Sequence, residues 1–450
     1  MSFPAYPSYR DSGVEWLGAV PSHWGVDRLK ASIIDCRNGV WGEEADGGDS
    51  DILCVRVADF DRTSLRVSLA NQTQRRVTAR EREDRLVRPG DLLLEKSGGG
   101  EKQPVGAVVL FEHPVDAVCS NFVARIRLAG GMVPGYWLYV HAAAYAARLT
   151  VGSINQTSGI QNLDQWRYFE ERAPFPPASE QAAIAAFLDR ETARIDALIE
   201  EQQRLIELLK EKRQAVISHA VTKGLDPTAP MKDSGVEWLG KIPAHWQLAP
   251  LKRDLAFLTS GSRGWAEHYA DDGALFIRIG NLTRDSIDLD LSDIQMVEVP
   301  KGSEGERTRV RPGDVLFSIT AFLGSVAVIP DQMEEAYVSQ HVALARPSSR
   351  YFLPDWIGYV TLSYLGKTQL EIGGYGGTKV QLSLGDVGDL LISAPPLAEQ
   401  VTIVQSLEGQ LRRLSSLSCE AQIAVEILQE RRSALISAAV TGKIDVRGVH

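Results

Sequence analysis

The stretch DSGVEWLGAVPSHWGVDRLK at residues 11–30 occurs a second time, as DSGVEWLGKIPAHWQLAPLK at residues 233–252. Thirteen of the twenty positions are identical, at an offset of 222 residues. Self-similarity at about half the chain length indicates two copies of a whole domain rather than a solenoid of short repeats. The architecture of this 450-residue chain is therefore expected to follow from a duplication.

Shorter matches carry the repeat to the end of the sequence. They pair residues 53–57 with 275–279, 87–91 with 310–314, 176–181 with 395–400, and 215–222 with 434–441. The first two matches lie in segments of mixed pattern, and the last two bracket segments of helical pattern. Each copy is thus predicted to be a globular part followed by a helical part.

Composition describes an ordinary soluble protein, with 44% hydrophobic and 24% charged residues. No apolar run approaches the roughly 20 residues that span a bilayer, and the first residues lack a signal sequence, so we expect a cytoplasmic protein without membrane contact. The four cysteines, Cys36, Cys54, Cys119 and Cys419, are far apart and form no C-x-x-C motif. Reduced thiols are expected, and neither a zinc site nor a disulfide framework is predicted.

The formal net charge is −10, which by itself argues against a nucleic-acid partner. It does not exclude one, because the field that matters is local. Residues 75–88 contain six arginines interrupted by three acids. We interpret this stretch as a solvated face held by salt bridges.

Each globular part is predicted to be an α+β domain of mixed strands and helices. Turn residues and β-branched runs predict strands, and apolar residues at helical spacing predict helices. The expected strands are 53–58, 92–95 and 105–111 in the first copy and 275–280, 315–319 and 325–329 in the second, and the expected helices are 136–149 and 354–370.

After each P-P-x-x-E-Q motif the pattern becomes that of a long helix whose seam positions alternate between steps of four and three residues. That is the 3.5-residue period of a coiled coil. Polar residues interrupt both seams at aligned places. The apolar seam positions are Ile184, Leu188, Ile195, Leu198, Leu205 and Leu209 in the first helix and Ile403, Leu407, Leu414, Leu417, Leu428 and Leu435 in the second.

A helix of roughly 42 residues, about 63 Å long, cannot bury such a stripe alone. We therefore expect the two helices to pair antiparallel and to separate two tandem domains related by a pseudo-two-fold axis. The predicted division is residues 1–177 and 243–396 for the domains, 178–222 and 397–441 for the helices, 223–242 for a junction, and 442–450 for a C-terminal tail.

The sequence carries no convincing catalytic motif. H-E-x-x-H, the phosphate-binding G-x-x-x-x-G-K-[ST], and the Asn/Asp-Pro-Pro-Tyr/Phe tetrapeptide of adenine methyltransferases are all absent. Residues 373–379 only superficially resemble a phosphate loop, because the lysine follows the threonine. His23 and His245 recur beside tryptophans, and we interpret them as packed structural residues.

Glycine-rich polar loops occur at matching places in the two copies but differ in sequence. Their side chains are of the kinds that hydrogen-bond to base edges and phosphates. One scaffold with two different polar surfaces would suit two different short sequences on one DNA duplex. The candidate DNA-binding residues are Arg37, Asn38, Trp41, Lys96, Ser97, Lys102, Asn121, Asn155, Gln156, Thr157, Gln161 and Asn162 in the first copy, and Arg263, Trp265, Thr320, Gln340, His341, Tyr375, Thr378, Lys379 and Gln381 in the second.

The duplicated D-S-G-V-E-W-L-G-x-x-P-x-H-W, P-P-x-x-E-Q and S-x-A-V-T motifs resemble those of specificity subunits of Type I restriction-modification systems, and the resemblance covers nearly the whole chain. It implies two target recognition domains, each reading one half of a split site in double-stranded DNA, and helices that set the unread spacer. It also implies two copies of a modification subunit as partners, with restriction subunits as further partners of the complex. S-adenosylmethionine would be bound by the modification subunit, so this chain is expected to hold no cofactor, no metal and no catalytic residue.

Two other classes of function compete with this interpretation. A free-standing DNA-binding regulator could use the same two domains, and would bind its site tightly without partners. A fused enzyme is the third possibility, and the missing motifs argue against it. Co-purification of a methyltransferase would separate the first two classes.

Overall fold

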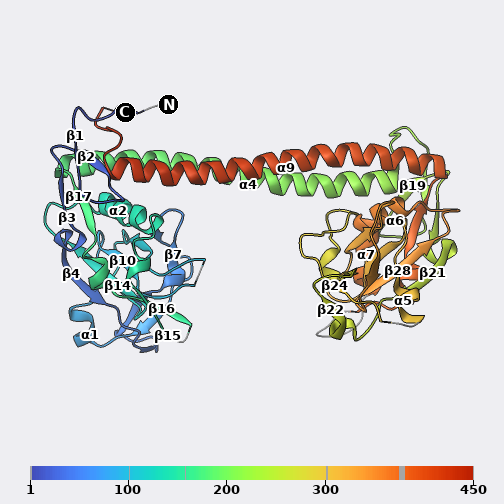
Figure 1. Ribbon diagram of the computed structural model, residues 1–450, viewed down its shortest axis with the longest axis horizontal. Helices are drawn as coiled ribbons and strands as arrows, with labels where there is room; N and C mark the ends of the chain where they lie inside the picture. The colour runs from blue at the N-terminus through green and yellow to red at the C-terminus, as the bar shows by residue number, and fades with distance from the viewer. Residues whose placement is uncertain (1–2, 101, 158, 301–302, 374–380, 449–450) are drawn as a thin grey trace. The chain divides into compact units, whose positions relative to one another are not determined.

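The computed structural model describes residues 3–100, 102–157, 159–300, 303–373 and 381–448. The chain divides into two compact units, which Figure 1 shows as ribbons. Unit 1 joins residues 1–203 to residues 422–450, and unit 2 comprises residues 204–421. Each unit therefore contains one globular domain with one half of each long helix. None of the described helices has an apolar stretch of the length that a bilayer requires.

Unit 1 is built on a six-stranded sheet with the strand order β4-β14-β10-β12-β8-β7. Strand β10 pairs antiparallel with both of its neighbours, and Leu92, Leu93 and Leu94 in it are fully buried, so both faces of the sheet are covered. The bounds are β4 Ile33–Asn38, β14 Val123–Leu128, β10 Leu92–Glu95, β12 Val108–Leu110, β8 Arg66–Val67 and β7 Phe60–Asp61.

Smaller sheets complete unit 1. A four-stranded sheet runs in the order β13-β6-β9-β5, with β6 parallel to β13. A three-stranded sheet, β11-β16-β15, lies at the end of the unit away from α4 and α9 (Figure 1). The bounds are β13 Ala117–Cys119, β6 Asp51–Val55, β9 Gln74–Arg76, β5 Glu43–Glu44, β11 Ser97–Gly98, β16 Ile160–Leu163 and β15 Ile154–Thr157, with the two-stranded pairs β1 Tyr9–Asp11 with β2 Ala19–Pro21 and β3 Gly25–Arg28 with β17 Arg172–Phe175.

Unit 2 repeats this topology. Its sheet β21-β28-β25-β26 corresponds to β4-β14-β10-β12, and its sheet β22-β24-β23-β27 again contains one parallel pair, β23 with β27. The duplication read from the sequence is thus confirmed for these two sheets, whereas β7, β8 and the sheet β11-β16-β15 have no counterpart among the described strands of unit 2. The bounds are β21 Leu255–Ser260, β28 Val342–Pro347, β25 Val315–Ser318, β26 Val326–Val328, β22 Tyr269–Ala270, β24 Met296–Val297, β23 Ala274–Ile277 and β27 Ala336–Val338, with the pairs β18 Met231–Asp233 with β19 Lys241–Pro243 and β20 Gln247–Pro250 with β29 Leu391–Ala394.

The helices follow the predicted places with one correction. The segment expected as a single helix at 354–370 is two helices, because Ser363 turns to an extended conformation with ψ 169° and its hydroxyl donates to the Val360 carbonyl oxygen at 2.5 Å. The bounds are α1 Ala79–Glu83, α2 Pro134–Ala146, α3 Gln165–Tyr168, α4 Ala178–Lys223, α5 Ser303–Thr308, α6 Pro354–Leu362, α7 Tyr364–Gly373, α8 Leu384–Asp389 and α9 Leu397–Val440, with 3-10 turns at Leu29–Ser32, Val57–Asp59, Val151–Ser153, Leu251–Asp254, Trp265–His268 and Ile279–Asn281.

The duplicated motifs fasten each domain to the first turn of its long helix. In unit 1, Glu180 accepts hydrogen bonds from the Trp24 indole Nε1 at 2.9 Å and from the His23 ring at 2.7 Å. The carboxylate also lies at the helix N-terminus, where negative charge is favoured. His23 is thus bonded within the junction, but its side chain is 42% exposed and not packed as predicted, and that of His245 is 49% exposed. The same contacts recur in unit 2 among His245, Trp246 and Glu399.

The glutamine of the motif has its own duplicated role. Gln181 is buried, donates from Nε2 to the Pro176 carbonyl oxygen, and accepts at Oε1 from the Val133 amide that precedes α2. Gln400 bonds in the same way to the Pro395 carbonyl oxygen and the Leu353 amide. Glu and Gln in P-P-x-x-E-Q are therefore junction residues, which explains why both copies retain them.

Helices α4 and α9 pack together, and nine of the twelve predicted apolar seam residues are buried or partly buried. Ile184, Leu188 and Ile195 are buried, and so are Ile403 and Leu407. The seam positions 188, 195, 202 and 209, which are seven residues apart, face inward as predicted. Between them the prediction placed a seam residue three positions further on, whereas the inward-facing residue lies four positions further on. Leu198 (40% exposed), Leu205 (41%) and Leu417 (48%) accordingly face solvent. The residue after each of them is buried (Ile199) or partly buried (Ile206 and Ser418).

An arginine holds the helices to the domain in each unit. Arg432 on α9 donates to Asp196 on α4 at 2.8 Å and to the Thr63 carbonyl oxygen. In unit 2, Arg213 on α4 donates to Ser415 on α9 at 2.8 Å and to the Asp285 carbonyl oxygen at 2.6 Å. On α4 the two contact residues, Asp196 and Arg213, are 17 residues apart. Their partners on α9, Arg432 and Ser415, are also 17 residues apart but follow in the opposite order, as antiparallel helices require.

Candidate nucleic-acid interface

A close backbone approach brings the polar loops of each domain together. After β4, the Gly39 amide donates to the Val123 carbonyl oxygen at 2.9 Å, and the Val40 amide donates to that of Cys119 at 2.8 Å. A Cβ atom at Gly39 would lie 2.0 Å from the Cys119 oxygen, so only glycine fits. In unit 2, a Cβ atom at Gly261 would likewise lie 2.1 Å from the Ser339 oxygen and 2.2 Å from the Val338 oxygen.

Five of the predicted residues in unit 1 meet beside this approach. The Lys96 ammonium donates to the Asn38 side-chain oxygen at 2.7 Å, and the Ser97 hydroxyl donates to that of Asn162 at 2.6 Å. Asn155 lies opposite Asn162 in the pairing of β15 with β16, and both side chains are exposed. Amide, hydroxyl and ammonium groups thus share one surface, which can offer both hydrogen-bond donors and acceptors to a base edge.

The remaining exposed candidates of unit 1 flank this group. Asn121 is exposed, and the next residue along the chain, Phe122, accepts backbone hydrogen bonds from Lys96 and Ser97. Arg37 is exposed and forms an ion pair with Asp35 at 2.9 Å. Trp41 is 40% exposed, and the Arg75 guanidinium lies 4.4 Å from its ring centroid.

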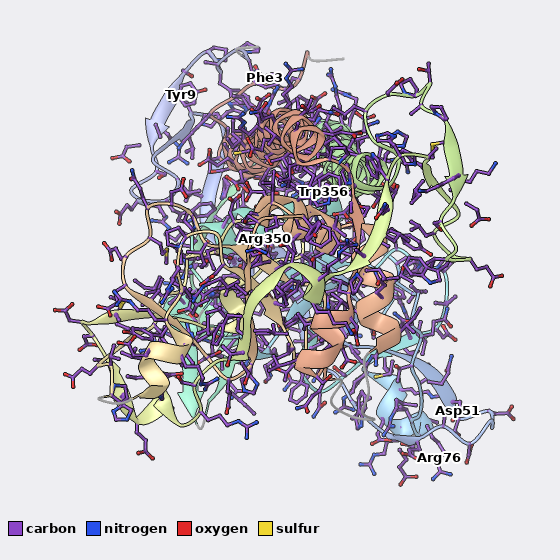
Figure 2. The ribbon with its side chains drawn as sticks, turned by 90° about the vertical axis from the view of Figure 1, so that its right-hand side faces the viewer. Phe3, Tyr9, Asp51, Arg76, Arg350 and Trp356 are labelled. Carbon is purple, nitrogen blue, oxygen red and sulfur yellow. The ribbon has the colours of Figure 1, made fainter. Side chains whose placement is uncertain are left out.

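The salt-bridged face predicted for residues 75–88 is confirmed at one of the six arginines, because only Arg76 of these forms ion pairs among the described residues. Arg76 forms ion pairs with Glu43 and with Asp46, the latter at 2.6 Å. Hydrogen bonds from the Gly48 amide and from Arg76 lower the pKa of Asp46, so this carboxylate stays charged. Figure 2 shows Arg76 near Asp51, its partner in the β6–β9 pairing, at the edge of unit 1 away from α4 and α9.

Three predicted base-reading residues are corrected, because their side chains are buried. Gln161 is 7% exposed and its Oε1 accepts from the Val105 amide at 3.2 Å. Trp265 is 4% exposed and stacks on Phe276 with ring centroids 5.7 Å apart. Thr320 is 8% exposed, and its carbonyl oxygen accepts from the Ser318 hydroxyl. All three hold the domains together.

Lys102 lies apart from the group around Asn38. It lines a different hollow of unit 1 with Arg62, Tyr145 and Arg148. Gln156 and Thr157 belong to β15, but their side chains lie outside what the structure describes.

In unit 2 the exposed candidates occupy the equivalent end of the domain. Gln340 follows β27 as Asn121 follows β13, and its amide nitrogen lies 3.1 Å from the His341 ring. Gln381 is exposed and forms a β-bridge with Thr320. Arg263 is exposed two residues after Gly261. Tyr375, Thr378 and Lys379 lie outside the described residues.

Exposed apolar side chains at these loops were missing from the prediction. Phe122 is 51% exposed, Ile160 52% and Phe322 63%, and the Arg284 guanidinium lies 6.0 Å from the Phe322 ring centroid. Large apolar groups of this kind contact thymine methyl groups or wedge between base steps. An aromatic residue inside a polar loop was the signal that could have identified the two phenylalanines.

The thiols and the buried histidine of unit 1 have pKa values shifted by burial. Among the described residues, no group of three or more histidine, cysteine or acidic side chains could hold a metal ion. Burial raises the pKa of the Cys36 thiol to about 12, and that of Cys119 likewise, so these thiols stay protonated and unreactive. The only fully buried histidine of the described chain, His141, hydrogen-bonds to the Tyr168 hydroxyl, and burial lowers its pKa to about 4.

Two domains of one topology, each joined to a long helix and each presenting its own polar loops, define a bipartite recognition protein. A comparison with models of protein families gives no match. Two curated relatives from Escherichia coli are similar over most of the chain. The Type I restriction enzyme EcoBI specificity subunit is 22% identical over 366 residues, 80% of this chain and 74% of its own length. The EcoKI specificity subunit of strain K12 is 21% identical over 371 residues, 81% of this chain and 76% of its own length.

Solved structures have the same fold. A chain from a study of complex assembly and conformational transition of the type I R-M system superposes with a TM-score of 0.66 at 17% identity, covering 94% of this chain and 98% of its own. The HsdS subunit from Thermoanaerobacter tengcongensis gives a TM-score of 0.52 at 17% identity, with the same coverage. The resemblance to Type I specificity subunits is thus confirmed over most of the chain.

Proposed function

We propose that this chain is the non-catalytic DNA-recognition subunit of a Type I restriction-modification complex. The observation that carries the proposal concerns the polar loops of each domain, which meet at Gly39 in unit 1 and at Gly261 in unit 2. The loops occupy equivalent places in the two units but carry different polar residues. Each domain reads one half of a bipartite site in double-stranded DNA. The similarity to named specificity subunits supports DNA and other subunits of such a system as partners.

The partners in our proposal are two modification subunits, which supply S-adenosylmethionine binding and methyl transfer. Restriction subunits complete the nuclease complex in the cell. The nearly neutral, ion-paired surface around Arg76 suits this division of roles, because the partners then provide much of the phosphate contact. The purified chain should transfer no methyl group from labelled S-adenosylmethionine to DNA, and transfer by the lone chain would overturn the proposal.

The direct test uses cells in which the chain is expressed with its modification subunit, followed by sequencing of methylated sites. Asn162→Ala should relax or change one half-site only, at a cost of about 1–3 kcal/mol per lost bidentate base contact. Gln203→Ala, exposed on α4, is the matched control and should leave the site unchanged. Loss of both half-sites in Asn162→Ala would show that recognition is not divided between the domains.

We also propose that the paired helices set the length of the unread spacer. Four residues inserted near Gln203 add about 6 Å of helical rise, or one to two base pairs of DNA. The methylated site should then keep both half-sites around a longer spacer. An unchanged spacer in an active variant would assign that role to the partner subunits.

The competing function is a DNA-binding regulator that acts alone. It predicts that the purified chain binds its bipartite site as tightly without a modification subunit as with one. Gel-shift titrations in the presence and absence of the partner distinguish the two functions.

A further inference from the structure

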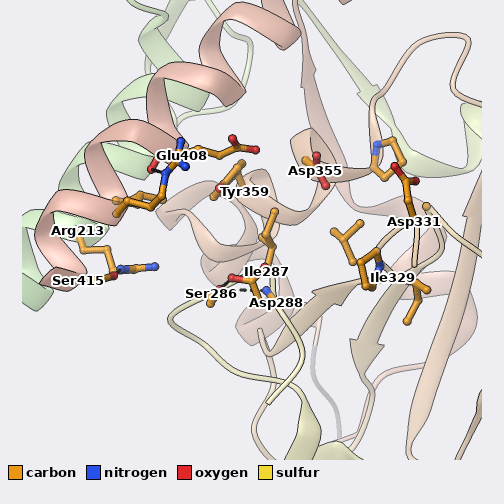
Figure 3. A pocket seen from close by; sticks show the side chains of 16 residues that line it. Arg213, Ser286, Ile287, Asp288, Ile329, Asp331, Asp355, Tyr359, Glu408 and Ser415 are labelled. Atoms are coloured by element: carbon orange, nitrogen blue, oxygen red, sulfur yellow. Dashed lines mark hydrogen bonds between the residues drawn. The ribbon is translucent and has the colours of Figure 1, made fainter. Parts of the chain in front are cut away.

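Unit 2 contains an acidic hollow between its domain and the helices. It has a volume of ≈ 680 Å³ and is shown in Figure 3. Four carboxylates line it, from four different segments: Asp288, Asp331, Asp355 at the start of α6, and Glu408 on α9.

These carboxylates lack neutralising partners. Within the described chain, Asp331, Asp355 and Glu408 form no side-chain hydrogen bond or ion pair, and Asp288 accepts only from the Ser286 hydroxyl, at 2.5 Å, and forms no ion pair. Burial raises the pKa of Asp355, and the charges of Glu408, Asp288 and Asp331 raise it further. Four carboxylates and two arginines line the hollow, so its lining has an excess of negative charge.

The two arginines at the hollow donate hydrogen bonds to groups other than its carboxylates. Arg213 directs its guanidinium to the Asp285 carbonyl oxygen and the Ser415 hydroxyl. Arg412 is exposed on α9, and its Nε donates to the backbone oxygen of Glu408 at 3.3 Å. Neither forms an ion pair with a carboxylate of the hollow in the structure.

A tyrosine whose ring is buried also faces the hollow, and its hydroxyl reaches the open space there. Tyr359 is only 5% exposed and lines the hollow beside Glu408 (Figure 3). Its hydroxyl has no hydrogen-bond partner among the described residues. The hydroxyl is thus available to a ligand that enters the hollow.

Unit 1 shows what occupies the same place in the other copy. There Arg66 places its guanidinium 2.7 Å from Glu112 and 3.1 Å from Asp189. The Tyr139 hydroxyl donates to the same Asp189 carboxylate at 2.8 Å. A guanidinium thus completes a carboxylate–tyrosine site in unit 1.

The correspondence between the two places is residue by residue. S-L-R at 64–66 aligns with S-I-D at 286–288, so Asp288 stands where unit 1 has Arg66. The backbone agrees, since the Leu110 amide donates to Leu65 and the Val328 amide donates to Ile287. Tyr359 matches Tyr139, and Glu408 matches Asp189. Unit 2 keeps the carboxylate and the tyrosine but has lost the internal cation.

We propose that the hollow of unit 2 binds a guanidinium group from outside the chain, either an arginine side chain of a partner subunit or a free guanidinium compound. Asp331 and Asp355 add two carboxylates at places where unit 1 has His113 and Gly135. A planar guanidinium can bind two carboxylates at once, as Arg66 does in unit 1. The site does not depend on which DNA sequence the loops read.

The binding test uses N-acetyl-arginine amide as the probe and the neutral citrulline amide as its matched control, with the full chain and calorimetry. The arginine probe should bind, and Asp355→Asn should weaken binding by about tenfold, which corresponds to one charge-assisted contact. Asp288→Arg should fill the hollow from within, abolish probe binding and raise the melting temperature. Equal binding of the two probes, or probe binding retained in Asp288→Arg, would overturn the proposal.

Two further experiments ask where the guanidinium ligand comes from and whether Arg412 of this chain occupies the hollow itself. If the ligand is a partner's arginine, Asp288→Arg should weaken assembly with the modification subunit, and if it is a free compound, assembly should be unchanged while probe binding is lost. Both results support the site, and neither depends on DNA recognition, which methylation of the correct half-sites reports separately. Binding of the probe only after Arg412→Ala would show that Arg412 occupies the hollow, and would overturn the proposal.

Discussion

Replacing Gly39 by alanine should damage unit 1 and leave unit 2 intact. The new Cβ would lie 2.0 Å from the Cys119 oxygen and 2.2 Å from the Ser120 oxygen, whereas real Cβ contacts are essentially never below 3.0 Å. The two segments must therefore separate by about 1 Å. This would break the hydrogen bonds from Gly39 to Val123 and from Val40 to Cys119, which are 2.9 and 2.8 Å long.

The expected cost combines two effects. Overpacking costs about 1–3 kcal/mol, and each lost backbone hydrogen bond costs about 0.5–1.5 kcal/mol. We therefore expect Gly39→Ala to lower the free energy of unfolding of unit 1 by about 3 kcal/mol. One half of the methylated DNA site should be lost with it, since the polar loops no longer meet.

The assay is urea unfolding with hydrogen exchange at residues 36–41 and 117–123, paired with sequencing of methylated sites. Gly152→Ala is the control, because a Cβ there meets nothing within 4 Å and the backbone needs no positive φ. Its effect should stay within about 0.5 kcal/mol. Equal effects of the two variants, or equal loss of both half-sites, would refute the reasoning.

Three further changes test the helices, the junction and the hollow. Ile199→Ala should cost about 2 kcal/mol or more in urea unfolding, and Leu198→Ala less than about 1 kcal/mol, because only Ile199 is buried; equal costs would restore the predicted seam. Glu180→Ala should lower the melting temperature by removing the acceptor of the buried Trp24 indole, at about 1–3 kcal/mol, and an unchanged melting temperature would mean that this contact adds no stability. Asp355→Asn should stabilise unit 2 at neutral pH, because the raised pKa of Asp355 means that its charged form opposes folding. That gain should vanish as the pH falls through the raised pKa, where wild-type Asp355 also becomes neutral, and a gain independent of pH in thermal unfolding would contradict this.

The sequence predicted the parts of the fold that the duplication repeats. The V-R-P-G-D turn leads into β10 at the predicted bounds, and its Asp91 accepts from Arg127 just as Asp314 accepts from Arg346. Two independent copies of one pattern identify a turn or a helix start even when neither copy alone is decisive. The P-P-x-x-E-Q helix starts were confirmed for the same reason.

The predictions that were wrong concern side chains whose burial depends on residues far away in the sequence. Strand β16 alternates, so Gln161 points inward while Asn162 points outward, and the polar sequence I-Q-N-L does not reveal that phase. Trp265 lies in a glycine-rich loop, yet Phe276 and Tyr337 bury it. Along α4, both Leu198 and Ile199 are apolar, and only packing against α9 decides which one faces inward.

The composition of unit 1 has a consequence for synthesis on the ribosome. Its core contains Tyr6 and Trp24 together with Ile436, Val440 and Val446, and the Asp445 amide bonds to the Pro4 carbonyl oxygen. Unit 2 is one continuous segment, residues 204–421. The domain that is translated first can therefore close only after residues 436–446 have left the exit tunnel, while unit 2 has all its residues before then. During that interval the nascent chain exposes part of an apolar core, so termination or slow translation before residues 436–446 endangers the domain that is translated first.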